Sequence, residues 1–160
     1  MRTPFDAPRH WRFVAGARNA ARPGDALCFV FQEGRLIVDT GPEGPVAHSR
    51  LFELAGLNPL HKHFLGLWQG ISCFSGVLDS DIPLPPGLAS VDLRRFAMEV
   101  QDEDLFAMAS RAQQIVDWDQ SHAYCSRCGG DTQDHARDFA KVCSACGYTQ
   151  YPRISPCIIV

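Results

Sequence analysis

The sequence lacks most of the features that would mark a membrane, secreted or generally nucleic-acid-binding protein. No apolar run approaches the roughly eighteen residues that a membrane helix needs, and the first residues contain no apolar stretch that resembles a secretory signal. The formal net charge is -3 and the pI is near 6.0, whereas a general nucleic-acid binder is normally basic. We therefore expect no membrane association and no broad phosphate-tracking surface.

Glutamate is also scarce. The 160 residues contain five glutamates, at positions 33, 43, 53, 99 and 103, and neither an Arg-Glu nor a Glu-Glu dipeptide occurs anywhere. Their scatter along the chain forms no cluster of glutamates for a hydrolytic metal site. No other carboxylate cluster replaces it, because Asp131, Asp134 and Asp138 all lie between two pairs of cysteines.

Cysteine, in contrast, is plentiful and regularly spaced. Two Cys-x-x-Cys pairs, Cys125/Cys128 and Cys143/Cys146, are separated by fourteen residues, and each is followed by a glycine that tolerates positive φ. Four thiolates suffice to close a tetrahedral shell around Zn²⁺ with no open position, so we expect a structural zinc. Two disulfides or a redox Cys-x-x-Cys are the alternatives.

Three further cysteines lie in apolar or β-branched surroundings. Cys28, Cys73 and Cys157 are each expected to be small buried hydrophobes rather than nucleophiles. We call each Cys-x-x-Cys-Gly turn a knuckle. Seven cysteines, four of them in the two knuckles, indicate a reducing compartment, and we expect the protein to be cytoplasmic.

The alternation of apolar residues predicts an α+β fold with a mainly β amino-terminal domain. Residues 26–39 form two apolar runs around Glu33-Gly34, and residues 63–79 form two more around Gln69-Gly70, so each stretch is expected to be a β-hairpin. A short helix or turn is predicted at 48–57. His61 and His63 would point the same way on a strand, and a second metal site there lacks a third ligand.

A packed helix is predicted from 102 to 119. Asp102 is a good N-cap and acidic residues fill the first turn. Apolar residues then recur at steps of three and four, and we expect Phe106, Ile115 and Trp118 to be buried. His122 is expected to end the helix rather than to act as a fifth ligand.

Ribbon strands are predicted at 137–143 and 148–151, followed by an apolar run at 157–160 that resembles the first strand of a further domain. We therefore divide the chain into an amino-terminal domain (1–120), a zinc ribbon (121–152) and the start of a missing domain (153–160).

These motifs together resemble a known family. The order of a helix ending in WDQSHAYC, then YCSRCGG, CSACG and YPRISPCIIV, with DLRRF upstream, is similar to the zinc-containing NADH pyrophosphatases of the Nudix hydrolase superfamily. The resemblance is tight over about residues 93–160. It implies an amino-terminal domain and zinc ribbon that precede a Nudix domain, in an enzyme that splits NADH into NMNH and AMP with Mg²⁺ or Mn²⁺. In that family the metals are held by a glutamate-rich motif, the Nudix box, which needs an Arg-Glu and a Glu-Glu pair. This chain contains neither pair, so it is expected to be inactive alone.

The resemblance also implies partners and substrate contacts. Tyr151 matches a tyrosine near the dinucleotide, where it stacks on a base or merely packs between domains. Arg94 occupies a Leu-Arg position whose guanidinium reaches a phosphate or forms a surface ion pair. Asp138 matches a position where relatives carry a glutamate, which has a longer side chain. Family members tend to be homodimers whose amino-terminal domains complete the second subunit's site, and some remove an NAD cap from RNA.

The competing hypothesis is a stand-alone zinc-ribbon module that binds nucleic acid or protein. Residues 121–153 contain four Lys or Arg residues against three aspartates, a net charge of about +1. This charge is too balanced for a surface that follows phosphates.

Overall fold

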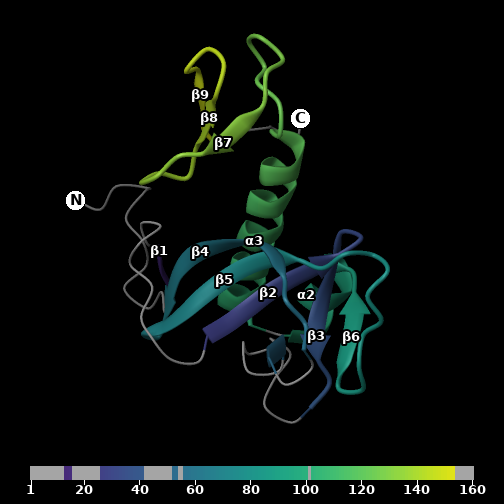
Figure 1. The fold of residues 1–160 in the computed structure, drawn as a ribbon. Coiled ribbons are helices and arrows are strands. Elements are labelled where there is room, and N and C mark those ends of the chain that lie inside the picture. Colours follow the sequence, from purple (N-terminus) through teal and green to yellow (C-terminus); the bar gives the residue numbers. More distant parts are fainter. Residues whose placement is uncertain (1–12, 16–25, 42–51, 54–55, 101, 154–160) are drawn as a thin grey trace, which may run out of the picture.

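The structure is a computed structural model that describes residues 13–15, 26–41, 52–53, 56–100 and 102–153 (Figure 1). The predicted helix or turn at 48–57 lies mostly outside these residues, as do Cys157 and the apolar run at 157–160. The α+β class is confirmed. Strands and helices follow in this order: β1 Phe13–Ala15, β2 Ala26–Gln32, β3 Arg35–Asp39, β4 Leu60–Trp68, β5 Ile71–Val77, β6 Leu88–Val91, α2 Leu93–Val100, α3 Glu103–Ser121, β7 Thr132–Asp134, β8 Lys141–Cys143 and β9 Thr149–Gln150.

Six strands form one mixed sheet in the order β1-β4-β5-β2-β3-β6. Strands β2 and β5 pair in parallel, while the other neighbours are antiparallel. Both predicted hairpins are confirmed, because Glu33-Gly34 joins β2 to β3 and Gln69-Gly70 joins β4 to β5. All four turn residues have positive φ, between 48° and 87°, which suits the tight turns that connect twisted strands.

The two faces of the sheet bury different side chains. Leu27, Phe29 and Phe31 of β2 join the core that α2 and α3 cover, whereas Val30 of the same strand faces a smaller cluster on the opposite side. Successive side chains of a strand alternate between faces, so this continuous apolar run contributes to both cores.

Helix α3 begins and ends close to the predicted positions. The side chain of Asp102 caps it by accepting hydrogen bonds from the backbone N–H groups of Asp104 and Leu105, both at 3.1 Å. At the other end His122 is the C-cap, as predicted. No helix in the described part of the chain is long and apolar enough to span a membrane.

The predicted burial on α3 is confirmed for Ile115 and Trp118, each 7% exposed, but wrong for Phe106, which is 37% exposed. The buried stripe centres on Ala109, Ala112 and Val116. At 3.6 residues per turn, Phe106 lies about 90° around the helix from the centre of that stripe. Leu105 packs against the core in its place.

The ribbon has shorter strands than predicted. Strand β8 begins only at Lys141, because the backbone N–H groups of Arg137 and Asp138 donate to Nδ1 of His135 and fold this segment into a turn. Strand β9 covers only residues 149–150 of the predicted 148–151, and β7 was not predicted. Figure 1 shows the ribbon standing at the carboxyl end of α3, away from the six-stranded sheet.

Candidate zinc centre and adjoining groove

The four cysteines of the two knuckles converge on one point. Their sulfur atoms all lie within 4.8 Å of one another, with 3.8 Å between Cys125 and Cys146 and 3.4 Å between Cys128 and Cys143. A tetrahedral zinc shell with bonds of about 2.3 Å places its sulfurs about 3.8 Å apart. The cluster therefore fits Zn²⁺. The alternative hypothesis required two disulfides, but all four cysteines are free.

Backbone geometry orients the sulfurs. In each knuckle the glycine after the second cysteine has positive φ, 76° at Gly129 and 70° at Gly147. Its N–H donates to the carbonyl of the first cysteine, at 2.9 and 3.0 Å respectively. The N–H groups of Arg127 and Cys146 each lie 3.4 Å from a cysteine sulfur. Such amides stabilise negative charge on the sulfurs, so the knuckles are prepared for thiolate ligands.

Two of these thiols have altered pKa values. Although the backbone N–H of Gly130 lowers it, hydrogen bonds with the neighbouring cysteine thiols raise the pKa of Cys128 to about 12. The backbone N–H of Cys146, followed by that of Ala145, lowers the pKa of Cys143 to about 6 against the opposing effect of desolvation. Four cysteine ligands leave no open position for a substrate, so a zinc ion held by them would be structural.

The ribbon is anchored to the end of α3. The Thr132 hydroxyl donates to the carbonyl of His122 at 2.6 Å, and Phe139 packs against the main core. Ring stacking between Trp118 and His122, with centroids 5.4 Å apart, extends this junction. Contacts with the end of α3 therefore fix the position of the ribbon.

A buried cluster of charged groups crosses the same junction, and sequence reasoning missed it. Lys141 Nζ lies 2.6 Å from Asp119 Oδ1, and His63 Nε2 lies 3.5 Å from the same oxygen. Asp119 and His63 are 3% and 4% exposed. His63 Nε2 and Lys141 Nζ lower the pKa of Asp119 to about 2, outweighing desolvation, which is the largest single effect and raises it.

The sequence contained one indication of this cluster, because Asp119 occupies a position within the otherwise apolar, buried stripe of α3. His63, considered above for a second metal site, contacts Asp119 instead. The side chain of His61 lies outside the described residues. Within the part of the chain that the structure describes, the four cysteines are the only group that could hold a metal ion.

Two of the three predicted substrate contacts lie together. The hydroxyl of Tyr151 is 3.4 Å from Asp138 Oδ2, and the Tyr151 side chain is 54% exposed. Arg94 lies on α2, which Figure 1 places at the opposite end of α3 from the ribbon. Within one chain, therefore, Arg94 does not join Tyr151 and Asp138.

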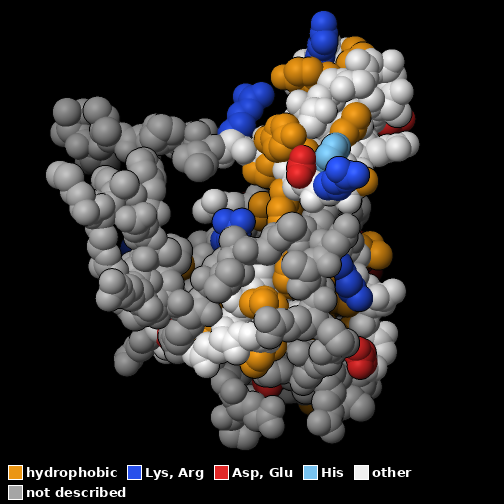
Figure 2. Space-filling model, turned by 90° about the vertical axis from the view of Figure 1, so that its left-hand side faces the viewer, with side chains coloured by type: hydrophobic (Ala, Val, Ile, Leu, Met, Phe, Trp, Pro, Cys, Tyr) orange, Lys and Arg blue, Asp and Glu red, His pale blue; other side chains and the backbone are white. Residues whose placement is uncertain are grey.

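A groove of about 780 Å³ runs between the last turns of α3 and the end of the ribbon, and we call it the α3–ribbon groove. Its lining comes from α3, the helix end, the ribbon loop and the segment after β9: Arg111, Gln114, Ile115, Asp117, Trp118, Ser121, His122, Phe139, Tyr151, Pro152 and Arg153. Figure 2 shows basic, acidic, histidine and hydrophobic side chains close together over the ribbon. The groove lining contains the same kinds of side chain, a mixture that suits a ligand that is both aromatic and charged.

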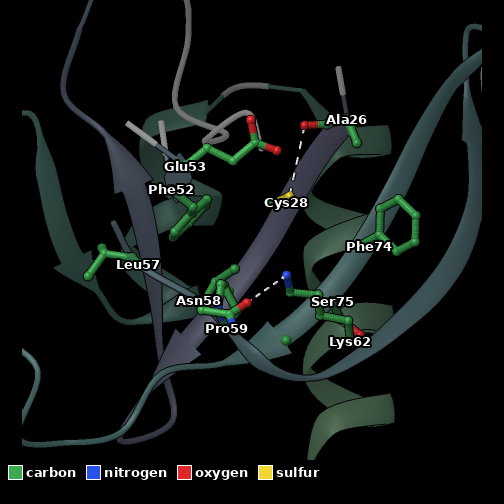
Figure 3. Close-up of a pocket in the computed structure, with 12 residues that line it drawn as sticks. Ala26, Cys28, Phe52, Glu53, Leu57, Asn58, Pro59, Lys62, Phe74 and Ser75 are labelled. Atoms are coloured by element: carbon green, nitrogen blue, oxygen red, sulfur yellow. Dashed lines mark hydrogen bonds between the residues drawn. The ribbon is translucent and has the colours of Figure 1, made fainter. Parts of the chain in front are cut away.

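A smaller cavity of about 310 Å³ lies on the sheet face opposite the helices. Figure 3 shows Phe52, Leu57 and Phe74 around it, with Lys62 tied to the side chain of Asn58 at 3.1 Å. Because its lysine is already engaged and most of its surface is apolar, this cavity does not resemble an anion or metal site.

Two family models match this chain. Residues 25–118 match the family described as "NADH pyrophosphatase-like rudimentary NUDIX domain", and residues 120–151 match "NADH pyrophosphatase zinc ribbon domain". The chain is 35% identical over 156 residues to a protein of Deinococcus radiodurans named "NAD-capped RNA hydrolase NudC", covering 98% of this chain and 52% of that protein.

A protein of the same name from Pseudomonas aeruginosa strain LESB58 is 41% identical over 152 residues, which cover 94% of this chain and 52% of the relative. An Escherichia coli O1:K1 protein of that name is 31% identical over 131 residues, covering 82% and 46%. The chain spans about half the length of the curated relatives it matches.

Proposed function

The chain belongs to the NADH pyrophosphatase-like NUDIX family, with the family's zinc ribbon attached, and from this premise we propose that it is the amino-terminal and zinc-ribbon portion of an NAD(H) pyrophosphatase. The proposed reaction splits the pyrophosphate of NADH to give NMNH and AMP. In this proposal residues 1–160 supply architecture, dimerisation and substrate contacts rather than the reacting groups.

The pairing of Tyr151 with Asp138 supports this role most directly. The resemblance implied a substrate contact for each of these residues. They are thirteen positions apart in the sequence, yet the Tyr151 hydroxyl lies 3.4 Å from Asp138 Oδ2. The exposed ring of Tyr151 offers a face on which a base can stack. Asp138 restrains the phenol and can accept a hydrogen bond from a ligand hydroxyl.

The ribbon cluster would hold these residues in place. Zinc bound by Cys125, Cys128, Cys143 and Cys146 would close the knuckles and fix the strand that leads to Tyr151. When bound in a Nudix domain, Mg²⁺ or Mn²⁺ would neutralise the pyrophosphate and activate a water. The sequence contains neither the Arg-Glu nor the Glu-Glu pair that would hold such metals. Residues 1–160 should therefore bind the dinucleotide but not hydrolyse it.

Arg94 fits this proposal through a homodimer. Arg94 is exposed, and its helix α2 lies at the opposite end of α3 from the ribbon (Figure 1). In a twofold dimer it could reach a phosphate in the second subunit's site, where a planar guanidinium binds bidentately. The relatives' name extends the proposal to NAD-capped RNA as a substrate, and a cytoplasmic location remains part of it.

The test compares residues 1–160 with a longer version that carries a downstream Nudix hydrolase domain. We expect NMNH and AMP only from the longer version, in the presence of Mg²⁺ or Mn²⁺. Chromatography of the products checks this. Hydrolysis by residues 1–160 alone, or an inactive longer protein that instead binds nucleic acid through the ribbon, would refute the proposal in favour of a different enzyme or of a stand-alone ribbon module.

A further inference from the structure

The α3–ribbon groove contains basic groups that no described residue neutralises. Arg111 and Arg153 are exposed and line the groove, and neither makes an ion pair or a side-chain hydrogen bond with the described part of the chain. Arg95, in contrast, is paired with Glu99 at 2.7 Å. Two unpaired guanidiniums in one concavity favour an anionic ligand, and phosphate matches their donor geometry.

One carboxylate lies in the same groove. Desolvation raises the pKa of Asp117, so its negative charge is disfavoured relative to an aspartate in water. The groove therefore contains two full positive charges against a single carboxylate. The net positive charge of the groove favours a ligand with a phosphate group and disfavours a cation.

Aromatic groups supply the second half of the chemistry. Tyr151 presents an exposed ring, and Trp118 and Phe139 line the same groove. The indole N–H of Trp118 is buried and has no hydrogen-bond acceptor among the described residues. Because water does not reach this nitrogen, the indole contributes its ring rather than its N–H to the groove.

His122 adds a directional group. Its Nδ1 lies 2.9 Å from the carbonyl of Trp118, a contact that requires the proton on Nδ1. In the neutral ring Nε2 is then an acceptor, which a ribose hydroxyl or an exocyclic amine can satisfy. The ring is half-buried and its position is fixed by stacking on Trp118.

We propose that the α3–ribbon groove binds a nucleoside phosphate unit, with its phosphate on Arg111 and Arg153 and its base against Tyr151. The volume of about 780 Å³ falls within the usual range of ligand sites. The proposal rests on the proposed function, since Tyr151 serves both, and it extends that function by adding a phosphate contact outside the Tyr151–Asp138 pair. The unit is either a free nucleotide or one residue of a single-stranded RNA.

The experiment measures binding by zinc-loaded residues 1–160, without any hydrolysis. A short fluorescein-labelled oligoadenylate is titrated in an anisotropy assay, and AMP is added as a competitor. We expect Arg111→Ala and Arg153→Ala each to weaken binding roughly 10- to 100-fold, as loss of a charge-assisted contact implies. Each should also lower the slope of log affinity against log salt by about 0.7.

Arg95→Ala is the matched control, because it removes the same charge from the surface outside the groove. Competition by AMP would assign the site to free nucleotides, and its failure to compete would assign the site to RNA; both uphold the proposal. Absence of binding, or equal weakening by all three variants, would overturn it.

The two proposals fail separately. NADH hydrolysis by the longer protein without binding at Arg111 and Arg153 would remove only this site. Binding that depends on both arginines, without NADH hydrolysis, would remove only the proposed enzyme.

Discussion

At the scale of single residues, the junction between ribbon and sheet depends on a buried charge. Asp119, on α3, is 3% exposed and lies 2.6 Å from Lys141 of β8, two positions before the cluster residue Cys143. Lys141 is itself 8% exposed and also lies 3.4 Å from the more exposed Asp134. Burying either charge without its partner would be costly, so the pair fixes how β8 sits on the helix.

Replacing one partner should therefore cost far more than replacing both. We expect Asp119→Asn to destabilise the protein by up to about 3–5 kcal/mol, because it leaves the buried Lys141 ammonium with only the more exposed Asp134, at 3.4 Å, as a counter-charge. Combining it with Lys141→Met should recover most of that loss. Urea denaturation of the four proteins in a double-mutant cycle measures the coupling, and additive losses would show that the pair is unimportant.

The pH dependence follows from the direction of the pKa shift. Asp119 has a lowered pKa of about 2 in the folded state and about 3.9 when unfolded. Its stabilising contribution is therefore complete above about pH 4 and is lost as the pH falls toward 2. The coupling energy between Asp119 and Lys141 should therefore be smaller at pH 2.5 than at pH 5, as urea denaturation at the two pH values would show.

Two phenylalanines give a second test at this scale. Phe96 of α2 is 2% exposed, whereas Phe106 of α3 is 37% exposed. Phe96→Ala should destabilise the protein by about 3–5 kcal/mol. Phe106→Ala should cost about 1 kcal/mol, since much of its ring already contacts water. Equal losses in thermal denaturation would mean that Phe106 is buried in solution.

At the scale of elements, the ribbon and the sheet differ in what holds them together. The sheet and its helices share a core that includes Phe29, Phe31 and Leu65. The ribbon has strands of only two or three residues, too short to bury a core of their own. We therefore attribute its stability to the metal and to its contacts with α3.

Removing zinc should unfold the ribbon and leave the sheet folded. After chelation, amide hydrogen exchange should become fast over residues 125–150 and stay slow over β2 and β5, because metal binding and folding are coupled in small ribbons. Exchange measured by mass spectrometry checks this. Elemental analysis should find one zinc per native chain, and a Cys143→Ser variant with an intact, protected ribbon would contradict the account.

The elements that were predictable from sequence are those specified locally. Two apolar runs on either side of a short turn ending in glycine marked each hairpin, Asp102 marked the start of α3, and the spacing of the cysteines marked the zinc ligands. The parallel pairing of β2 with β5 was not predictable, because it depends on the contact of strands separated by some forty residues. The turn around His135 was missed since its hydrogen bonds compete with an otherwise regular strand pattern.

The candidate site was predictable only in part. Spacing alone pointed to the four cysteines. The resemblance proposed Tyr151 and Asp138 as substrate contacts, and the structure shows only that these two residues lie side by side. The Asp119–Lys141 pair and the α3–ribbon groove arise from packing between segments far apart in sequence. No local pattern encodes such a meeting, although an aspartate within the apolar stripe of α3 was a signal of it.

At the scale of the whole molecule, the proposed substrate contacts lie at two ends of α3. A helix of 19 residues is about 28 Å long, so Arg94 and Tyr151 cannot be expected to grip one dinucleotide from the same chain. A twofold dimer resolves this separation, since each site would combine the ribbon of one subunit with α2 of the other.

Mixing two inactive variants tests that arrangement. In a longer version with a Nudix domain, Arg94→Ala and Tyr151→Ala should each reduce NADH hydrolysis. Subunits exchanged at equal amounts should regain about a quarter of wild-type activity, because half of the dimers then contain one intact site. Arg94→Lys should not fully restore activity, as a point charge cannot make the bidentate contact. No recovery on mixing would place both residues in one subunit's site or in none.

The most direct test of the central claim, that this ribbon forms part of a dinucleotide site, is kcat/KM for NADH in that longer protein. We expect Tyr151→Ala to lower it by an amount equivalent to about 1–3 kcal/mol, the value of a ring stacked on a base. Tyr151→Phe should keep nearly full activity, because the ring face is retained, and zinc content should be unchanged in both. Wild-type kcat/KM in Tyr151→Ala would contradict the account.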